Sequence, residues 1–351
     1  MKNKLVYKAI LTIAFTSVKS EANSELNILS WHGYTDADVV SYFEDKYNTK
    51  INITYVTNDK QLRNNIENTE QTFDIVVLNS SELKRYIRLN SILPIDISKV
   101  SNSKWLSEQF TPLRRNTKTS QHGTIYGMPF TYSSMGMIYH KDRVKTPPSS
   151  WNAFWSTTYD KKVLSYDGGT HNTSLAALVL NLDDPFNIPN TEQSNIAEKL
   201  IALRDNSLTF YDSVEEATQL FNQFEMSLMF ANFGRQQLTS LQKSGANVAY
   251  TIPTEGALSW LDCWAILADT EHSELAHQWI NFVLEPWVQL EITQRHGLQS
   301  PLAQFSPDTQ QQKLIWLTPV ESPHEREAMW DAVYSGKSLE KVMEHTKRAK
   351  P

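Results

Sequence analysis

The chain has 351 residues, a net charge of −6 and 40% hydrophobic residues, enough for one large or two medium-sized domains with a substantial core. Charges of both signs are spread along it, and no long apolar run follows the N-terminus, which argues against a membrane-spanning helix. No basic stripe with interleaved aromatic residues occurs, so nucleic-acid binding is not expected.

The N-terminus has the pattern of a secretory signal peptide. Lys2 and Lys4 precede an apolar stretch over residues 5–15, which Lys8 interrupts, and small residues precede a possible cleavage point after Ala22. We expect residues 1–22 to be a cleaved signal peptide and the protein to reach the periplasm. The alternative is an amphipathic N-terminus that stays attached.

The next segment alternates strands with helices, as an α/β domain with a mostly parallel sheet does. Residues 73–78 form a continuous apolar run, which predicts a strand buried on both faces. In such sheets ligands bind beyond the carboxyl ends of strands, where Trp31 and Asn79 fall. The predicted strands cover residues 26–30, 51–56 and 73–78, and the predicted helices residues 36–47, 61–68 and 81–89.

After strand-like segments at residues 126–130 and 136–140, a second α/β unit follows, and no flexible linker separates the two. This organisation predicts two lobes that the chain crosses more than once, with a ligand cleft between them. The second unit is predicted to contain strands at residues 162–166, 227–231, 248–252 and 260–267 and helices at residues 173–182, 193–206 and 214–225, with a long helix ending at residue 284.

Familiar enzyme motifs are missing from the sequence. It contains no GxGxxG, no GxxxxGK[ST] and no GxSxG. His272 and His277 are five residues apart and do not share a helix face, so they do not form a helical zinc motif. The single cysteine, Cys263, lies in an apolar segment and is expected to be a small core residue. We therefore expect no catalysis, no cofactor and no metal.

Aromatic and acidic residues instead gather at the ends of the predicted elements. Carboxylates pair with ammonium groups through charge-assisted hydrogen bonds, and aromatic faces attract cations and cover methylene chains. Each residue also has an ordinary structural explanation, such as core packing for Trp31 or a turn for Asp167, and it is their joint placement that favours an amine site. The residues that form this set are Trp31, Tyr34, Asn79, Ser81, Asp167, Asp212, Phe230, Trp260 and Asp262.

Five segments together resemble the periplasmic spermidine/putrescine-binding proteins of the PotD/PotF type, over residues 26–334. These segments read LNILSWHGY, FDIVVLNSSELKRYI, YGMPF, PTEGALSWLDCWAI and WINFVLEPWVQLEITQRHGLQSP. The resemblance implies the type II periplasmic binding protein fold, with two α/β lobes closing on ligand by a hinge. The implied boundaries are residues 23–130 plus 261–304 for one lobe and residues 131–260 plus 305–351 for the other.

The same resemblance implies roles for individual residues. Trp31 and Tyr34 would line the cleft, Trp260 would pack on the methylene chain and Asp262 would hold an amine. Phe230 stands where the family has a tryptophan. Asn79 would be a small polar contact.

The sequence also departs from the family pattern. Ser81 and Leu298 replace tyrosines, and His32 lies in an unusual middle pair of the Trp-x-x-Tyr segment. In the family an acidic pair holds a terminal amine of the ligand. In the corresponding segment of this chain, YDGGTHNT, only Asp167 is acidic, and His171 or Asn172 stands in place of the second carboxylate. Asp212, at a site where the family often has a hydroxyl, would restore a negative charge. These departures suggest altered amine selectivity.

The resulting hypothesis is a monomeric periplasmic polyamine-binding protein for spermidine, norspermidine or putrescine. By the same resemblance it serves an ABC permease, or it reports ligand to a membrane cyclic-di-GMP protein that controls biofilm formation, as a norspermidine-sensor-like member would. The alternatives are a binder of another solute (an amino acid, an opine or iron) or an exported hydrolase that uses the same cleft.

Overall fold

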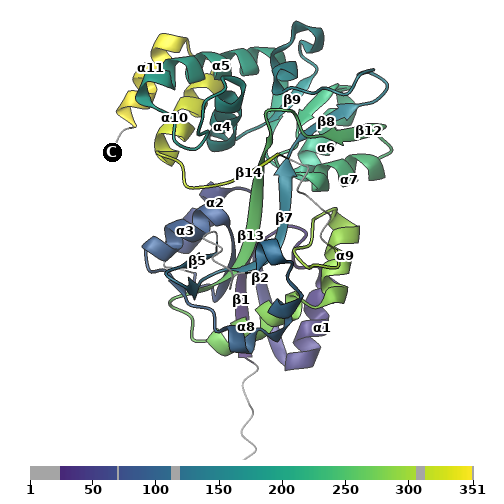
Figure 1. The fold of residues 1–351 in the computed structure, drawn as a ribbon, viewed down its shortest axis with the longest axis vertical. Helices are drawn as coiled ribbons and strands as arrows, with labels where there is room; N and C mark the ends of the chain where they lie inside the picture. The colour runs from purple at the N-terminus through teal and green to yellow at the C-terminus, as the bar shows by residue number, and fades with distance from the viewer. Residues whose placement is uncertain (1–23, 69–70, 112–118, 306–312, 350–351) are drawn as a thin grey trace, which may run out of the picture.

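Two halves, each a β-sheet flanked by helices, are stacked one above the other in the molecule (Figure 1). The structure is a computed structural model and describes residues 24–68, 71–111, 119–305 and 313–349. The expected signal peptide lies outside these ranges. Within them, no helix is both long and apolar enough to cross a membrane.

The lower half in Figure 1 is built on the larger sheet, in which strands follow the order β14-β13-β3-β1-β2, with β4 and β7 also paired to β13. All of β3 is buried, which confirms the strand predicted from the apolar run. The strands are β1 (Ser24–Trp31), β2 (Thr49–Val56), β3 (Ile75–Asn79), β4 (Ile92–Leu93), β7 (Met128–Met135), β13 (Ala257–Leu267) and β14 (Leu314–Trp316). The helices of this half are α1 (Ala37–Tyr47), α2 (Asp59–Glu67), α3 (Ser80–Arg88), α8 (Ser273–Val283) and α9 (Pro286–His296).

The upper half contains a second sheet with the strand order β10-β9-β11-β8-β12. Helices α4, α5, α10 and α11 pack together, with α5 on β10, whereas α6 contacts β9 and β10 and α7 contacts β12. Its strands are β8 (Met137–His140), β9 (Val163–Tyr166), β10 (Ser207–Tyr211), β11 (Leu228–Phe230) and β12 (Val248–Thr251). Its helices are α4 (Gly169–Val179), α5 (Gln193–Asn206), α6 (Val214–Gln223), α7 (Arg235–Lys243), α10 (Pro323–Tyr334) and α11 (Leu339–Arg348).

Short elements complete the described chain. Strands β5 (Ser120–Gln121) and β6 (Thr124–Ile125) pair with each other. The short 3₁₀ helices are η1 (Ile97–Lys99), η2 (Ser101–Trp105), η3 (Glu108–Phe110), η4 (Trp151–Trp155), η5 (Thr157–Tyr159) and η6 (Asn190–Glu192).

Both sheets are mixed, which corrects the expectation of mostly parallel sheets. In the larger sheet β1 runs parallel to β2 and β3, but β13 runs antiparallel to β3 and β7. In the smaller sheet β9 is parallel to β10 and β11, whereas β8 is antiparallel to β11 and β12. In the larger sheet the antiparallel pairs involve β13, the strand through which the chain re-enters this half, and in the smaller sheet they involve β8, the strand through which the chain enters.

The chain crosses between the halves three times, through β7, through β13, and after β14 on the way to α10. The chain leaves the larger sheet after β7, forms β8 to β12 in the upper half, and returns as β13, which pairs with β7 along most of its length. The lobe boundaries expected at 130/131 and 260/261 fall inside these two continuous strands. The two paired strands and the segment between β14 and α10 provide a hinge at which small changes in backbone angles can rotate one half relative to the other.

Candidate functional site

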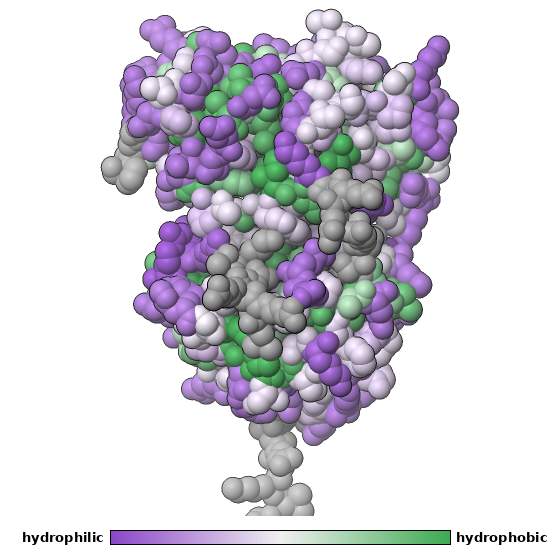
Figure 2. Space-filling model, in the orientation of Figure 1, coloured by the Kyte–Doolittle hydropathy of each residue, from purple (hydrophilic) through white to green (hydrophobic). Residues whose placement is uncertain are grey.

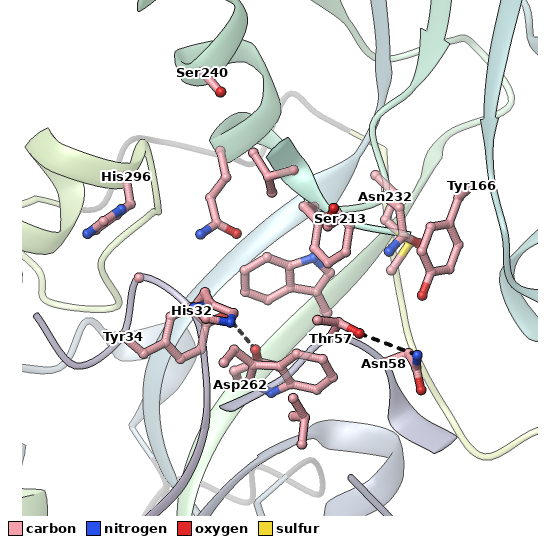
Figure 3. A pocket seen from close by; sticks show the side chains of 18 of the residues that line it. His32, Tyr34, Thr57, Asn58, Tyr166, Ser213, Asn232, Ser240, Asp262 and His296 are labelled. Carbon is pink, nitrogen blue, oxygen red and sulfur yellow. Dashed lines mark hydrogen bonds between the residues drawn. The ribbon is translucent and has the colours of Figure 1, made fainter. Parts of the chain in front are cut away.

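A cavity of about 440 Å³ lies between the two halves, at the carboxyl ends of β1 and β3. Figure 2 shows the waist between the two bulky halves, and Figure 3 shows the side chains that converge on the cavity from both. A second cavity of about 360 Å³ adjoins it and shares residues such as Asp59, Asn79 and Tyr166 with it. The interlobe cavity is therefore long, with room for an extended small molecule.

The turn after β1 brings two aromatic side chains to the cavity. Trp31 is the last residue of β1 and is half-buried in the lining. Gly33 has a φ of +84°, and a Cβ there would lie 3.1 Å from the His296 ring, so the tight turn favours glycine. The turn allows the exposed His32 to stack on Tyr55, with ring centroids 4.3 Å apart. It also directs Tyr34 inward.

Tyr34 and Asp262 form the buried polar centre of the cavity (Figure 3). The Tyr34 hydroxyl donates a hydrogen bond of 2.6 Å to Oδ2 of Asp262, which is only 6% exposed. Burial raises the pKa of Asp262 to about 7, against the lowering effect of the Tyr34 hydrogen bond. Trp260 precedes Asp262 by two residues on β13, so both side chains lie on the same face of the strand and both line the cavity.

Asn79 and Asp59 extend this centre toward the second cavity. Asp262 and Asn79 are partners across β13 and β3. The Asn79 side-chain oxygen caps α3 by accepting from the backbone N–H groups of Ser81 and Glu82, so its amide nitrogen is left to donate to Asp59 at 3.2 Å. Burial raises the pKa of Asp59, and the nearby Glu327 charge adds to the rise.

The upper half contributes a largely neutral wall. Nδ1 of His171 lies 2.7 Å from the side-chain oxygen of Asn232, and burial lowers the pKa of His171, so this imidazole is neutral at pH 7. Tyr166 packs its ring against Phe233 at 5.8 Å, and both line the cavity. An uncharged histidine thus stands in the region where the family resemblance implies a second carboxylate.

The opposite end of the cavity is basic, but its charges are occupied. Arg295 forms ion pairs with Asp36 at 3.2 Å and with Asp38 at 2.7 Å, and His296 lies 2.9 Å from Asp36. Lys243 of the upper half donates to the backbone oxygen of Arg295 at 2.7 Å. This last contact joins the two halves at the rim.

Four of the residues singled out in the sequence lie away from the main cavity. Ser81 and Asp167 line the second cavity, where Asp167 accepts a hydrogen bond of 2.7 Å from the Trp330 indole. Asp212 is exposed, and its neighbour Ser213 caps α6 and lines the main cavity instead. Phe230 is completely buried and packs on Trp151, with centroids 5.6 Å apart. The remaining six, which the structure brings together in the main cavity, are Trp31, His32, Tyr34, Asn79, Trp260 and Asp262.

Asp59 is a charged cavity residue that sequence reasoning missed. Asn58 caps α2 by accepting from the Gln61 N–H at 2.8 Å, and an acidic residue directly after such a cap is common because it favours the helix N-terminus. The available signal was its place after β2, at the same sheet edge as Trp31 and Asn79. In the described ranges, no group of three or more His, Cys, Asp or Glu side chains is placed to share a metal ion.

Known proteins share this architecture. The putrescine-binding periplasmic protein PotF of Escherichia coli is 24% identical over 304 residues, covering 82% of this chain and 80% of PotF. The putrescine-binding periplasmic protein SpuD of Pseudomonas aeruginosa is 24% identical over 285 residues, covering 77% and 76%. The spermidine/putrescine substrate-binding protein PotD of Streptococcus pneumoniae superposes with a TM-score of 0.70 at 18% identity, covering 93% of this chain and 99% of PotD.

These similarities establish the periplasmic binding protein fold of the PotD/PotF type, whose relatives bind substrates and are not enzymes. The family model for bacterial extracellular solute-binding proteins matches residues 38–315. The chain therefore belongs to the bacterial extracellular solute-binding protein family.

Proposed function

We propose that the protein is a periplasmic receptor for a polyamine, held in the cavity between its halves. The observation that carries the proposal is Asp262, a buried carboxylate set among Trp31, Trp260 and Tyr34. An ionised carboxylate in such surroundings lacks the solvation it has in water, and an ammonium group supplies a compensating charge. The aromatic rings suit the methylene chain between the amines.

The contacts expected between the cavity and an amine each contribute to binding free energy. A hydrogen bond to a charged group contributes about 1.5–3 kcal/mol, and each cation–π contact contributes about 0.5–2 kcal/mol. Trp31 and Trp260 come from different strands, β1 and β13, and both belong to the cavity wall. Micromolar binding corresponds to about 8 kcal/mol, and these contacts together with burial of the methylenes supply a large part of it.

A second candidate ligand is an amine that carries a hydrogen-bond acceptor at its other end, such as an ω-amino acid. One observation favours it: the buried indole nitrogen of Trp31 has no hydrogen-bond partner within the described part of the chain. An ammonium group cannot accept from that N–H, whereas a carboxylate or carbonyl oxygen can.

We propose that the protein acts in the periplasm and passes its ligand, or a ligand-bound signal, to a membrane partner. That partner is an ABC permease for uptake, or a cyclic-di-GMP sensor protein for biofilm signalling. Neighbouring permease and ATPase genes support uptake, whereas a gene for a GGDEF/EAL membrane protein supports sensing. For export, the mature chain is expected to begin at Asn23, which intact-mass measurement of periplasmic protein tests.

Titration calorimetry of the mature protein, freed of bound amines, tests the proposed ligand class. The panel contains putrescine, spermidine, norspermidine, 4-aminobutanoate and amino acids. Saturable heat with a polyamine supports the proposal. Heat with 4-aminobutanoate alone favours the second candidate, and turnover of any amine or ester by the purified protein would point to an enzyme.

A further inference from the structure

We infer that Asp59 is the second ammonium anchor of the cavity, so that a short amine with two ammonium groups is held between Asp59 and Asp262. This inference rests on the proposed function and identifies the selectivity residue of the same site. It places the second anchor on the lower half, at the start of α2, and not at Asp167 in the upper half.

The backbone brings the two carboxylates close together. Asn79 and Asp262 face each other across β3 and β13, and such cross-strand partners have Cα atoms about 4.5–5.5 Å apart. The Asn79 amide then reaches Asp59 with a hydrogen bond of 3.2 Å. Asp59, Asn79 and Asp262 therefore form a continuous series along one side of the cavity, and all three line it.

Asn79 fixes the direction of Asp59 as well as its place. The Asn79 oxygen accepts from the N–H groups of Ser81 at 2.9 Å and Glu82 at 3.0 Å, which determines that its NH₂ group faces Asp59. One oxygen of Asp59 is held by this bond. A carboxylate can accept several hydrogen bonds, so Asp59 keeps capacity for a ligand ammonium.

The charges around Asp59 leave it incompletely neutralised. Arg63 is the cation that attracts Asp59, but it also forms an ion pair of 2.9 Å with Glu82. Glu327 faces the same region from the upper half, where its carboxylate accepts from the N–H of Thr170 at 3.1 Å. Asp59, Glu82 and Glu327 thus share this region with Arg63, and Arg85, which also attracts Glu82, forms its own ion pair with Glu67. Asp262 lies just beyond Asn79. A ligand cation placed here reduces like-charge repulsion on both sides.

The alternative role of Asp59 is structural, since an acidic residue at the start of α2 stabilises the helix N-terminus. Both roles predict weaker amine binding when Asp59 is substituted. The test must therefore separate the loss of a contact to a ligand ammonium group from the loss of folded protein. The useful comparison uses putrescine and 1-aminobutane, which share a four-carbon chain but carry two and one ammonium groups. Only the anchoring role predicts that Asp59 determines the ratio of the affinities for putrescine and 1-aminobutane.

The experiment measures the affinities of both amines by calorimetry for the wild type, Asp59→Asn, Asp59→Glu and the control Asp45→Asn. Asp45 is an exposed carboxylate on α1, outside both cavities. We expect the wild type and the control to prefer putrescine by about tenfold or more, because one charged hydrogen bond contributes that much. Asp59→Asn should remove most of this preference, and Asp59→Glu should retain part of it.

An unchanged preference in Asp59→Asn would overturn the inference while leaving the proposed function intact, because the wild type still binds the amine. Failure of the wild type to bind either amine would overturn both. The melting temperature of each unliganded variant provides the folding check. If Asp59→Asn is strongly destabilised and its residual folded protein keeps the wild-type preference, Asp59 is only a helix-stabilising residue and the inference fails.

Discussion

Replacing Asp262 by asparagine should weaken amine binding and at the same time relieve a cost that the unliganded protein carries. Burial raises the pKa of this carboxyl from 3.8 to about 7. Between those values the folded state binds more protons than the unfolded state, so stability falls as the pH rises through this window. A shift of about three pH units corresponds to roughly 4 kcal/mol at most, fully expressed above pH 7.

Asp262→Asn removes this titration and keeps the shape of the side chain, including an oxygen that can accept from the Tyr34 hydroxyl. The free energy of unfolding of the wild type, measured by denaturant titration, should therefore fall relative to the variant between about pH 4 and about pH 8. At pH 8 the variant should bind putrescine roughly 10-fold to 100-fold more weakly, since a charged hydrogen bond is lost. Asp45→Asn, on the surface of α1, serves as the matched control.

The reasoning would be refuted if wild type and Asp262→Asn showed parallel pH dependences of stability. Equal putrescine affinities would refute the assigned binding role even if the stability profile behaved as expected. A variant that is destabilised at every pH would show that Asp262 mainly supports the fold through its bond to Tyr34.

Three further substitutions test other parts of the cavity. Tyr34→Phe removes the hydrogen bond that lowers the pKa of Asp262, so the pH midpoint of amine binding measured by calorimetry should move upward; an unmoved midpoint would contradict the coupling. Trp31→Ala should weaken putrescine binding about tenfold, with little change in the unliganded melting temperature, and simple unfolding would indicate a core role. Phe230→Ala should lower the free energy of unfolding by about 3–5 kcal/mol, because this ring is completely buried; a surface-like effect below about 1 kcal/mol would contradict that placement.

Much of the fold was predictable because its strands carry strong local patterns. The apolar run of β3 and the strand that ends at Trp31 are visible in the sequence. These strands alternate with the helices α1 and α3, which indicates an α/β sheet whose carboxyl edge lies at Trp31 and Asn79. The direction of β13 was not predictable, since it depends on the chain returning from the other half of the molecule. Helix α9 was also missed, although Pro286 at its start and Gly297 at its end are recognisable signals.

The candidate site was predictable where a residue type is unusual for its position. Trp31 at a strand end and Asp262 in an apolar segment are both unusual, and both line the cavity. Asp59 was missed because an acidic residue in the first turn of a helix is ordinary, and only tertiary structure places it beside Asn79. Phe230 was selected as an aromatic residue at a strand end, but its local packing against Trp151 buries it away from the cavity.

The most direct test of the account is calorimetric titration of the mature, amine-free protein with putrescine, spermidine and norspermidine at pH 8, where Asp262 is ionised. We expect saturable binding of at least one polyamine with one site per chain, and its loss or strong weakening in Asp262→Asn. The absence of heat with all three polyamines, in protein that melts cooperatively, would contradict the central claim that this cavity is a polyamine site.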